Sequence, residues 1–116
     1  PKFNVDMFLG IGGGPEGVIA ASALDAYDCH FQGRFIFDND KDIQEAKSMG
    51  IKDLNKKYEL KEIVKGDSIF CASGITSSEV IKGIVIEGDK FISETLVTHK
   101  NNNFKEIVKS VNSINE

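Results

Sequence analysis

The residues best suited to chemistry form a glycine-rich run, Leu9–Gly17, with the sequence LGIGGGPEG. Glycines between an apolar run and a helix start are typical of anion sites in α/β proteins, because unpaired backbone N–H groups and the positive end of the helix converge there. Gly12, Gly13 and Gly14 carry no side chains, so a ligand could approach the backbone closely. The run therefore predicts a phosphate site.

Glu16 adds a carboxylate to this turn and changes the chemistry expected of it. A carboxylate in the first turn of a helix is favoured by the helix dipole, and this is the simple structural interpretation. At a phosphate site, however, the same carboxylate would repel the ligand unless a divalent cation lay between them. Mg²⁺ and Mn²⁺ bind hard oxygen ligands and phosphate oxygens together. The residues alone leave both interpretations open and favour the structural one.

A dinucleotide fingerprint can also be placed on this run, at Gly12, Gly14 and Gly17. It puts a proline and a glutamate where an anionic pyrophosphate should approach, and Asp38 lies a few positions later than the acidic residue that the fingerprint requires. A free-standing phosphate- or nucleotide-binding module nevertheless stays as the alternative function.

The elements that must position this turn are read from apolar runs and their stops. Strands are predicted over 6–11, 30–37, 68–72, 83–87, 91–99 and 104–111, and helices over 15–25 and 60–64, with one helical turn near 76. A further helix is predicted to end at Met49, with its N-cap among Asp38, Asn39 and Asp40. The run from Phe104 also has helical spacing, so that segment stays open between strand and helix. The order predicts an α/β chain with a layered, mixed β-sheet and flanking helices, forming one domain over 1–116.

Composition excludes several classes of function. The net charge is −4 and the basic residues are scattered, which argues against nucleic-acid binding. No apolar run has the length of a membrane span, and no signal-peptide pattern is present. Cys29 and Cys71 have no metal-ligand spacing, and Cys71 lies in an apolar run that predicts a buried thiol. We therefore expect a cytoplasmic protein.

Several blocks of the sequence, taken in order, resemble class II fructose-1,6-bisphosphatases. The run GIGGGPEGVIAASAL closely resembles the family segment G-I-G-G-A-P-E-G-V. The later blocks are FQGRFIF (Phe31–Phe37), DLNKKYELKEIVKGDSIFCASGIT (Asp53–Thr76), KGI (Lys82–Ile84) and ETLV (Glu94–Val97). The resemblance continues to about His99, where the family usually has an arginine.

The resemblance implies the lithium-sensitive sugar-phosphatase fold, of which this chain would be the C-terminal domain. It implies hydrolysis of the 1-phosphate of fructose 1,6-bisphosphate with Mn²⁺ or Mg²⁺, a step of gluconeogenesis; some members also accept sedoheptulose 1,7-bisphosphate. By the resemblance, Glu16 would be a metal ligand and Gly13 a substrate contact. Gly14 replaces the usual alanine, which should leave the turn intact. No catalytic residue is assigned to this chain.

The family's other metal carboxylates belong to its N-terminal portion, which we expect to lie outside this chain. One glutamate cannot hold Mg²⁺ tightly, because the ion needs several oxygen ligands. We therefore expect the isolated chain to be inactive. Its expected partners are the N-terminal domain of the same protein, the sugar bisphosphate and further copies in a homo-oligomer, with no nucleic acid and no membrane.

Overall fold

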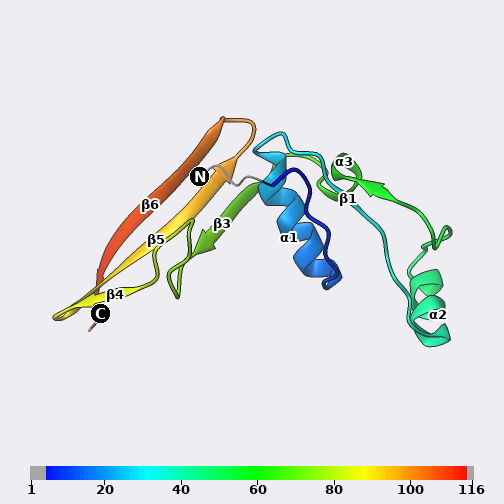
Figure 1. Ribbon diagram of the computed structural model, residues 1–116, viewed down its shortest axis with the longest axis horizontal. Coiled ribbons are helices and arrows are strands. Elements are labelled where there is room, and N and C mark those ends of the chain that lie inside the picture. The colour runs from blue at the N-terminus through cyan, green and yellow to red at the C-terminus, as the bar shows by residue number, and fades with distance from the viewer. Residues whose placement is uncertain (1–4, 115–116) are drawn as a thin grey trace. The chain divides into compact units, whose positions relative to one another are not determined.

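The computed structural model describes residues 5–114 and divides the chain into two compact units (Figure 1). The sheet unit comprises Pro1–Ile11 and Gly66–Glu116, and the helical unit comprises Gly12–Lys65. Within the described residues, no helix has the length and apolar character needed to cross a membrane.

The helical unit holds three helices and a two-stranded antiparallel sheet. Its elements are α1 (Gly14–Asp25), β1 (Gln32–Gly33), α2 (Asp40–Ser48), β2 (Tyr58–Glu59) and α3 (Leu60–Ile63). The α1 helix packs against α3, and the strand β1 pairs with β2. The buried apolar side chains of this unit are small apart from one leucine: Ala21, Ala26, Ala46 and Leu60.

Local sequence signals fix where the helices of this unit begin. The Asn39 side chain accepts a hydrogen bond from the Asp42 N–H at 2.9 Å, which confirms the predicted cap of α2. The Glu62 carboxylate accepts a hydrogen bond from the Glu59 N–H at 3.0 Å and so caps the first turn of α3. In α1 the proline stands in the first turn, where its lack of an N–H costs no hydrogen bond.

The sheet unit is built around one central strand. Its strands are β3 (Ile69–Ser73), β4 (Val85–Glu87), β5 (Lys90–His99) and β6 (Phe104–Ser113). Figure 1 shows β6 along the whole of β5, and the register pairs all 10 residues of β5 with β6. Because a strand has two edges, β3 and β4 share the other edge of β5, each pairing with one end of it.

Tight turns join the neighbouring strands of this sheet. Asn103 adopts a positive φ of 50° between β5 and β6, and its N–H donates to the Lys100 carbonyl at 2.9 Å. Gly88 takes a φ of 65° between β4 and β5. The open prediction for the last segment is therefore settled as a strand, since β5 offers it a full ladder of partners.

The α/β class predicted from the sequence is confirmed, and several details of the prediction are corrected. All strand pairs of the described residues are antiparallel, so the sheet is not mixed. The strand expected over 30–37 contracts to Gln32–Gly33, and the helical turn expected near 76 does not form. Residues 6–11 form no strand either, because strand propensity is realised only against a neighbouring strand and the part of the chain that the structure describes offers them none. Cys71 is exposed on β3, so its predicted burial is wrong.

Candidate metal and phosphate site

The glycine-rich turn forms the N-terminus of α1 in the helical unit. Gly13 is the N-cap residue, with φ −67° and ψ 155°, and its carbonyl accepts the Gly17 N–H at 3.0 Å. No side chain caps this end of the helix. Residues 12–16 are all exposed, so the unbonded N–H groups of the first turn face solvent and could bind an anion.

The Glu16 carboxylate bends back over Gly13. A Cβ atom placed on Gly13 would overlap Oε2 of Glu16 and lie 3.1 Å from its Cδ. Glycine at this position therefore makes the room that the carboxylate occupies. A Cβ on Gly12 or on Gly17 would meet nothing within 4 Å, so neither glycine is required by a close contact. The structure brings together Gly13 and Glu16, the two site residues predicted from the sequence.

Among the described residues, the Glu16 carboxylate has no hydrogen-bond or ion-pair partner. Nor does any cluster of three or more His, Cys, Asp or Glu side chains within 5–114 suit a metal ion. Mg²⁺ and Mn²⁺ require several oxygen ligands. Glu16 therefore fits such an ion as one ligand of a set, with an oxygen of the right hardness and no competing partner in the described chain.

An aromatic cluster lies beside the same turn, and the sequence did not predict it. A Cβ on Gly14 would lie 3.9 Å from Cε1 of Phe35. The Phe35 ring is 6.0 Å from Phe37 and 5.8 Å from Tyr58, between ring centroids. These rings support the start of α1 from within the helical unit. In the sequence, the apolar run FIF indicated only Phe35 and Phe37, and such runs more often indicate core packing than a site.

The structure assigns no role in this site to His99 or Arg34. His99 lies in the sheet unit, where its Nε2 is 2.7 Å from Oδ1 of Asp67, so it is a hydrogen-bonded histidine. Arg34 is exposed and has no hydrogen-bond or ion-pair partner among the described residues.

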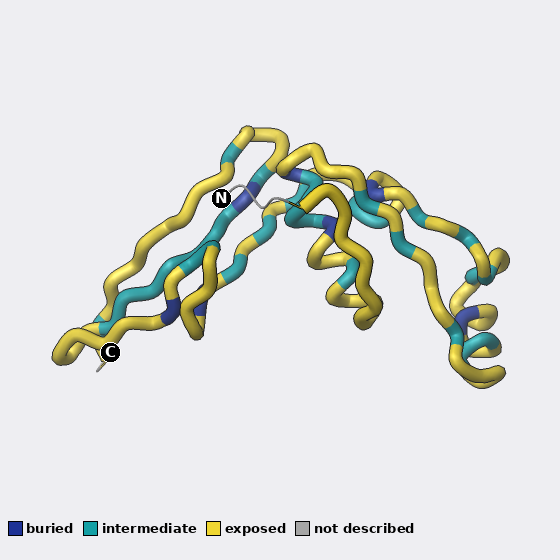
Figure 2. The backbone as a smooth tube through the Cα atoms, viewed as in Figure 1, coloured by how far each residue is buried: buried dark blue, intermediate teal, exposed yellow. Residues whose placement is uncertain are grey.

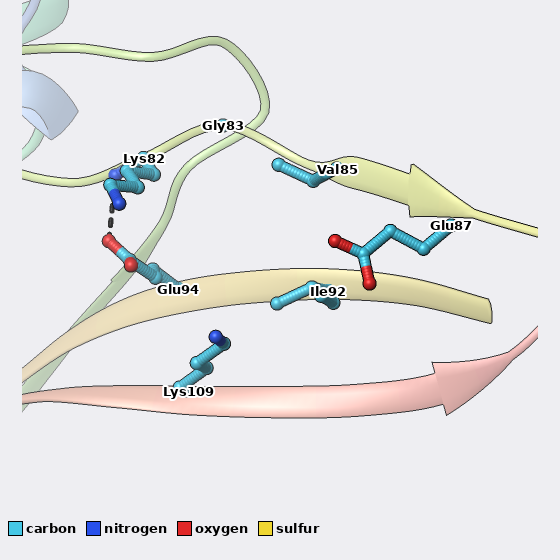
Figure 3. A pocket seen from close by; sticks show the side chains of 7 residues that line it. All are labelled: Lys82, Gly83, Val85, Glu87, Ile92, Glu94 and Lys109. Atoms are coloured by element: carbon cyan, nitrogen blue, oxygen red, sulfur yellow. Dashed lines mark hydrogen bonds between the residues drawn. The ribbon is translucent and has the colours of Figure 1, made fainter.

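A shallow hollow of about 170 Å³ lies in the sheet unit and was not predicted (Figure 3). Two carboxylates and two ammonium groups surround an isoleucine there, and the Lys82 N–H donates to Oε2 of Glu94 at 2.9 Å. The lining residues are Lys82, Gly83, Val85, Glu87, Ile92, Glu94 and Lys109. The mixed charges fit no single class of anion or cation, so the hollow is not assigned a ligand.

Comparison with known proteins identifies the family. A sequence model described as bacterial fructose-1,6-bisphosphatase, glpX-encoded, matches residues 1–114. The chain belongs to this family, which confirms the resemblance found in its sequence. It is 36% identical, over 81% of its length, to a protein of a Synechococcus strain named D-fructose 1,6-bisphosphatase class 2/sedoheptulose 1,7-bisphosphatase. A protein of the same name from Trichodesmium erythraeum is 30% identical over 97% of the chain.

The chain spans only about a third of these relatives. The matched region covers 31% of the Synechococcus protein and 36% of the Trichodesmium protein. The relatives therefore contain about twice as much further sequence as the region matched here.

Proposed function

We propose that the chain is one part of a metal-dependent fructose-1,6-bisphosphatase, in which Glu16 is a metal ligand and the Gly13 backbone contacts the substrate. The observation that carries this proposal is the Glu16 carboxylate folded over Gly13 at an exposed, uncapped helix start. Membership of the fructose-1,6-bisphosphatase family supports the reaction, and the names of the relatives support fructose 1,6-bisphosphate or sedoheptulose 1,7-bisphosphate as substrate.

In this proposal each residue of the turn has a separate task. The free N–H groups of the first turn of α1 bind phosphate oxygens, with the positive end of the helix favouring the anion. The Glu16 carboxylate supplies negative charge for a cation beside that phosphate. A bound Mg²⁺ or Mn²⁺ would act as a Lewis acid toward the phosphoryl group. Gly13 keeps the space that lets the carboxylate and the backbone serve the same ligand.

We further propose that the isolated chain is inactive and that the other ligands come from the rest of the family protein. One carboxylate is too few for a tightly held Mg²⁺, and no ligand cluster occurs within 5–114. The two free, exposed thiols, Cys29 and Cys71, support the proposed location in a reducing cytoplasm. Assembly into a homo-oligomer stays a prediction.

The test is complementation. The chain is co-expressed with the Synechococcus relative from which the matching region has been removed, and phosphate release from fructose 1,6-bisphosphate is measured with Mn²⁺. We expect activity only with both parts. Glu16→Gln should lower kcat/KM by roughly 10- to 100-fold or more, since even outer-shell partners of metals produce such losses. Glu45→Gln, on the exposed surface of α2, is the matched control and should leave the rate unchanged.

Two outcomes would contradict the proposal. An active complex that ignores Glu16→Gln would remove the metal role of this residue. Tight binding of inorganic phosphate or ATP by the isolated chain without metal, measured by calorimetry, would favour the phosphate- or nucleotide-binding module instead.

A further inference from the structure

The segment that leads into the glycine turn is apolar and exposed. Within residues 5–114, the structure gives residues 5–11 neither a strand partner nor a hydrogen bond. Their large apolar side chains are between 62% and 88% exposed, and Figure 2 shows exposure along the whole segment: Val5, Met7, Phe8, Leu9 and Ile11. Water is an unfavourable environment for five large apolar side chains within seven residues.

The helix that follows the turn has the same property. The apolar residues of α1 are spread around its circumference, and helices of this kind are normally buried on all sides. Only Ala21 is buried in this helix, whereas Val18 and Ile19 are 50% and 56% exposed. The packing of α1 on the four-residue helix α3 therefore covers a small part of its apolar surface.

The two segments together have the sequence of a strand, a turn and a helix. Consecutive apolar residues over 7–9 place apolar side chains on both faces of a strand, which is the pattern of strands covered on both faces in parallel sheets. Such a strand needs neighbouring strands along its edges and helices on its faces, and the described chain provides none of these for residues 5–11.

We propose that residues 5–11 form a strand within a β-sheet supplied by the rest of the fructose-1,6-bisphosphatase, and that α1 covers that sheet. The family model matches these residues along with the others, and about two thirds of each relative's sequence lies outside the region matched here. The exposed apolar surface is thus an interface for that remaining part. The inference rests on family membership and is independent of the metal role of Glu16.

A second copy of the chain is a poorer occupant of this surface. Two copies of an unpaired strand would make only a two-stranded ribbon, which is marginally stable in water. The charged residues Lys105, Glu106 and Lys109 on the edge strand β6 also disfavour the addition of a strand from another copy.

Hydrogen–deuterium exchange tests this proposal with a readout other than catalysis. Exchange is followed in the chain alone and in the complex obtained by co-expression with the truncated Synechococcus relative. We expect the amides of residues 7–11 to exchange at least roughly 100-fold more slowly in the complex, as sheet hydrogen bonds require. The turn Lys100–Asn103, which joins β5 to β6, serves as the internal reference and should not change.

Side-chain substitutions provide the second measurement. The double variant Phe8→Asn with Leu9→Asn should weaken the complex by roughly 100-fold or more, because two large apolar contacts are lost. Its far-ultraviolet circular dichroism should match that of the unchanged chain, since both side chains are over 80% exposed. Met49→Asn replaces an equally exposed apolar side chain outside the segment and should leave the affinity unchanged.

Several results would overturn the proposal. Protection of residues 7–11 in the chain alone would show pairing within the chain, and protection that rises with chain concentration would show pairing between copies. Unchanged exchange in a stable complex would exclude the strand. If residues 7–11 are protected in a complex whose activity does not change with Glu16→Gln, only the metal assignment is refuted. If the complex is active but residues 7–11 exchange as fast as in the chain alone, only the strand is refuted.

Discussion

The glycine at position 13 determines where the carboxylate at position 16 can lie. Its backbone angles suit any residue, so the need for glycine comes from space and not from a left-handed backbone conformation. The neighbouring Gly12 has open space around it and provides a comparison within the same turn. The two glycines look equivalent in the sequence and differ in three dimensions.

Gly13→Ala should displace the Glu16 carboxylate and remove a favourable N-cap residue. We expect the free energy of unfolding of the chain to fall by about 1 kcal/mol, as for alanine at other N-caps. We also expect a loss of activity in the complemented enzyme. Gly12→Ala, with nothing within 4 Å of its Cβ, should change both far less. Urea unfolding and phosphate release measure the two effects, and equal losses in the two variants would contradict the role of Gly13.

Gly14→Ala should stabilise the chain. Position 14 is the first residue of α1, its Cβ would make an ordinary contact with Phe35 at 3.9 Å, and alanine is the better helix former. We expect a gain of about 0.5 kcal/mol, seen as a higher thermal midpoint. A lower midpoint would mean that the aromatic cluster leaves no room for a methyl group.

At the scale of elements, the loop between β3 and β4 is held by close backbone contacts. Gly74 and Gly83 are buried in it, and the Gly83 N–H donates to Oγ of Ser77 at 3.0 Å. The Lys82 N–H binds the Glu94 carboxylate of β5, which ties the loop to the central strand. This loop was predicted to hold a helical turn, and its tight glycine packing gave no signal in the sequence.

Gly83→Ala should destabilise the sheet unit. Its Cβ would lie 2.7 Å from the Ile75 carbonyl oxygen and 2.7 Å from the Ser77 nitrogen, and backbone atoms cannot rotate away. We expect a loss of about 2 kcal/mol, within the range for overpacked positions. The urea midpoint of Gly83→Ala is compared with that of the control Gly12→Ala. Equal midpoints for the two variants would show that the loop can move to accommodate the methyl group.

The first turn of α3 should make stability depend on pH. Hydrogen bonds from Lys56, and then from the Glu59 N–H, hold the pKa of Glu62 below its ordinary value of 4.5. The folded-state pKa is lower than the unfolded one, so the stabilisation is present above about pH 4.5 and is lost as pH falls through the lowered folded value. The same pair raises the pKa of Lys56 above 10.5, so its contribution is lost only in strongly alkaline solution.

Urea midpoints at pH 7 and pH 3.5 test this dependence. Part of the loss at low pH should disappear in Glu62→Gln, whereas Glu45→Gln should retain all of it. The effect will be small and weaker in high salt, because the pair is exposed to solvent. An unchanged pH dependence in Glu62→Gln would assign the acid sensitivity to other carboxylates.

Local features of the fold were predictable from the sequence, and features that need distant partners were not. The Asn39 cap and the proline-led start of α1 depend on residues within one turn, and both were predicted. The register of β5 against β3 depends on residues far apart in the chain, so the antiparallel pairing was missed. Gly13 and Glu16 lie within one turn and were both named as site residues from the sequence, while Phe35 approaches the turn from a more distant part of the sequence.

At the scale of the whole molecule, the apolar core is small. Among residues 5–114, the buried apolar side chains are three alanines and Leu60, and many larger apolar side chains are exposed. Burial of apolar surface is the main favourable contribution to folding. The isolated chain should therefore be marginally stable, with each unit gaining stability from whatever covers its apolar surface.

The isolated chain should bind the apolar dye ANS strongly. Exposed apolar surface binds this dye, as it does in states with incomplete tertiary packing. In the complex with the truncated relative, most of that surface should be covered. We therefore expect the fluorescence of the bound dye to fall by roughly half or more. Equal fluorescence in the chain and the complex would show that the partner covers other surfaces.

The order in which the sheet unit folds follows from its hairpin. The strands β5 and β6 are adjacent in the chain and joined by a short turn, so their ladder can close first, on the microsecond timescale of hairpins. Pairing of β3 with β5 must close a longer loop and comes later. We therefore expect substitutions in the Lys100–Asn103 turn to slow refolding, and substitutions in β3 mainly to accelerate unfolding.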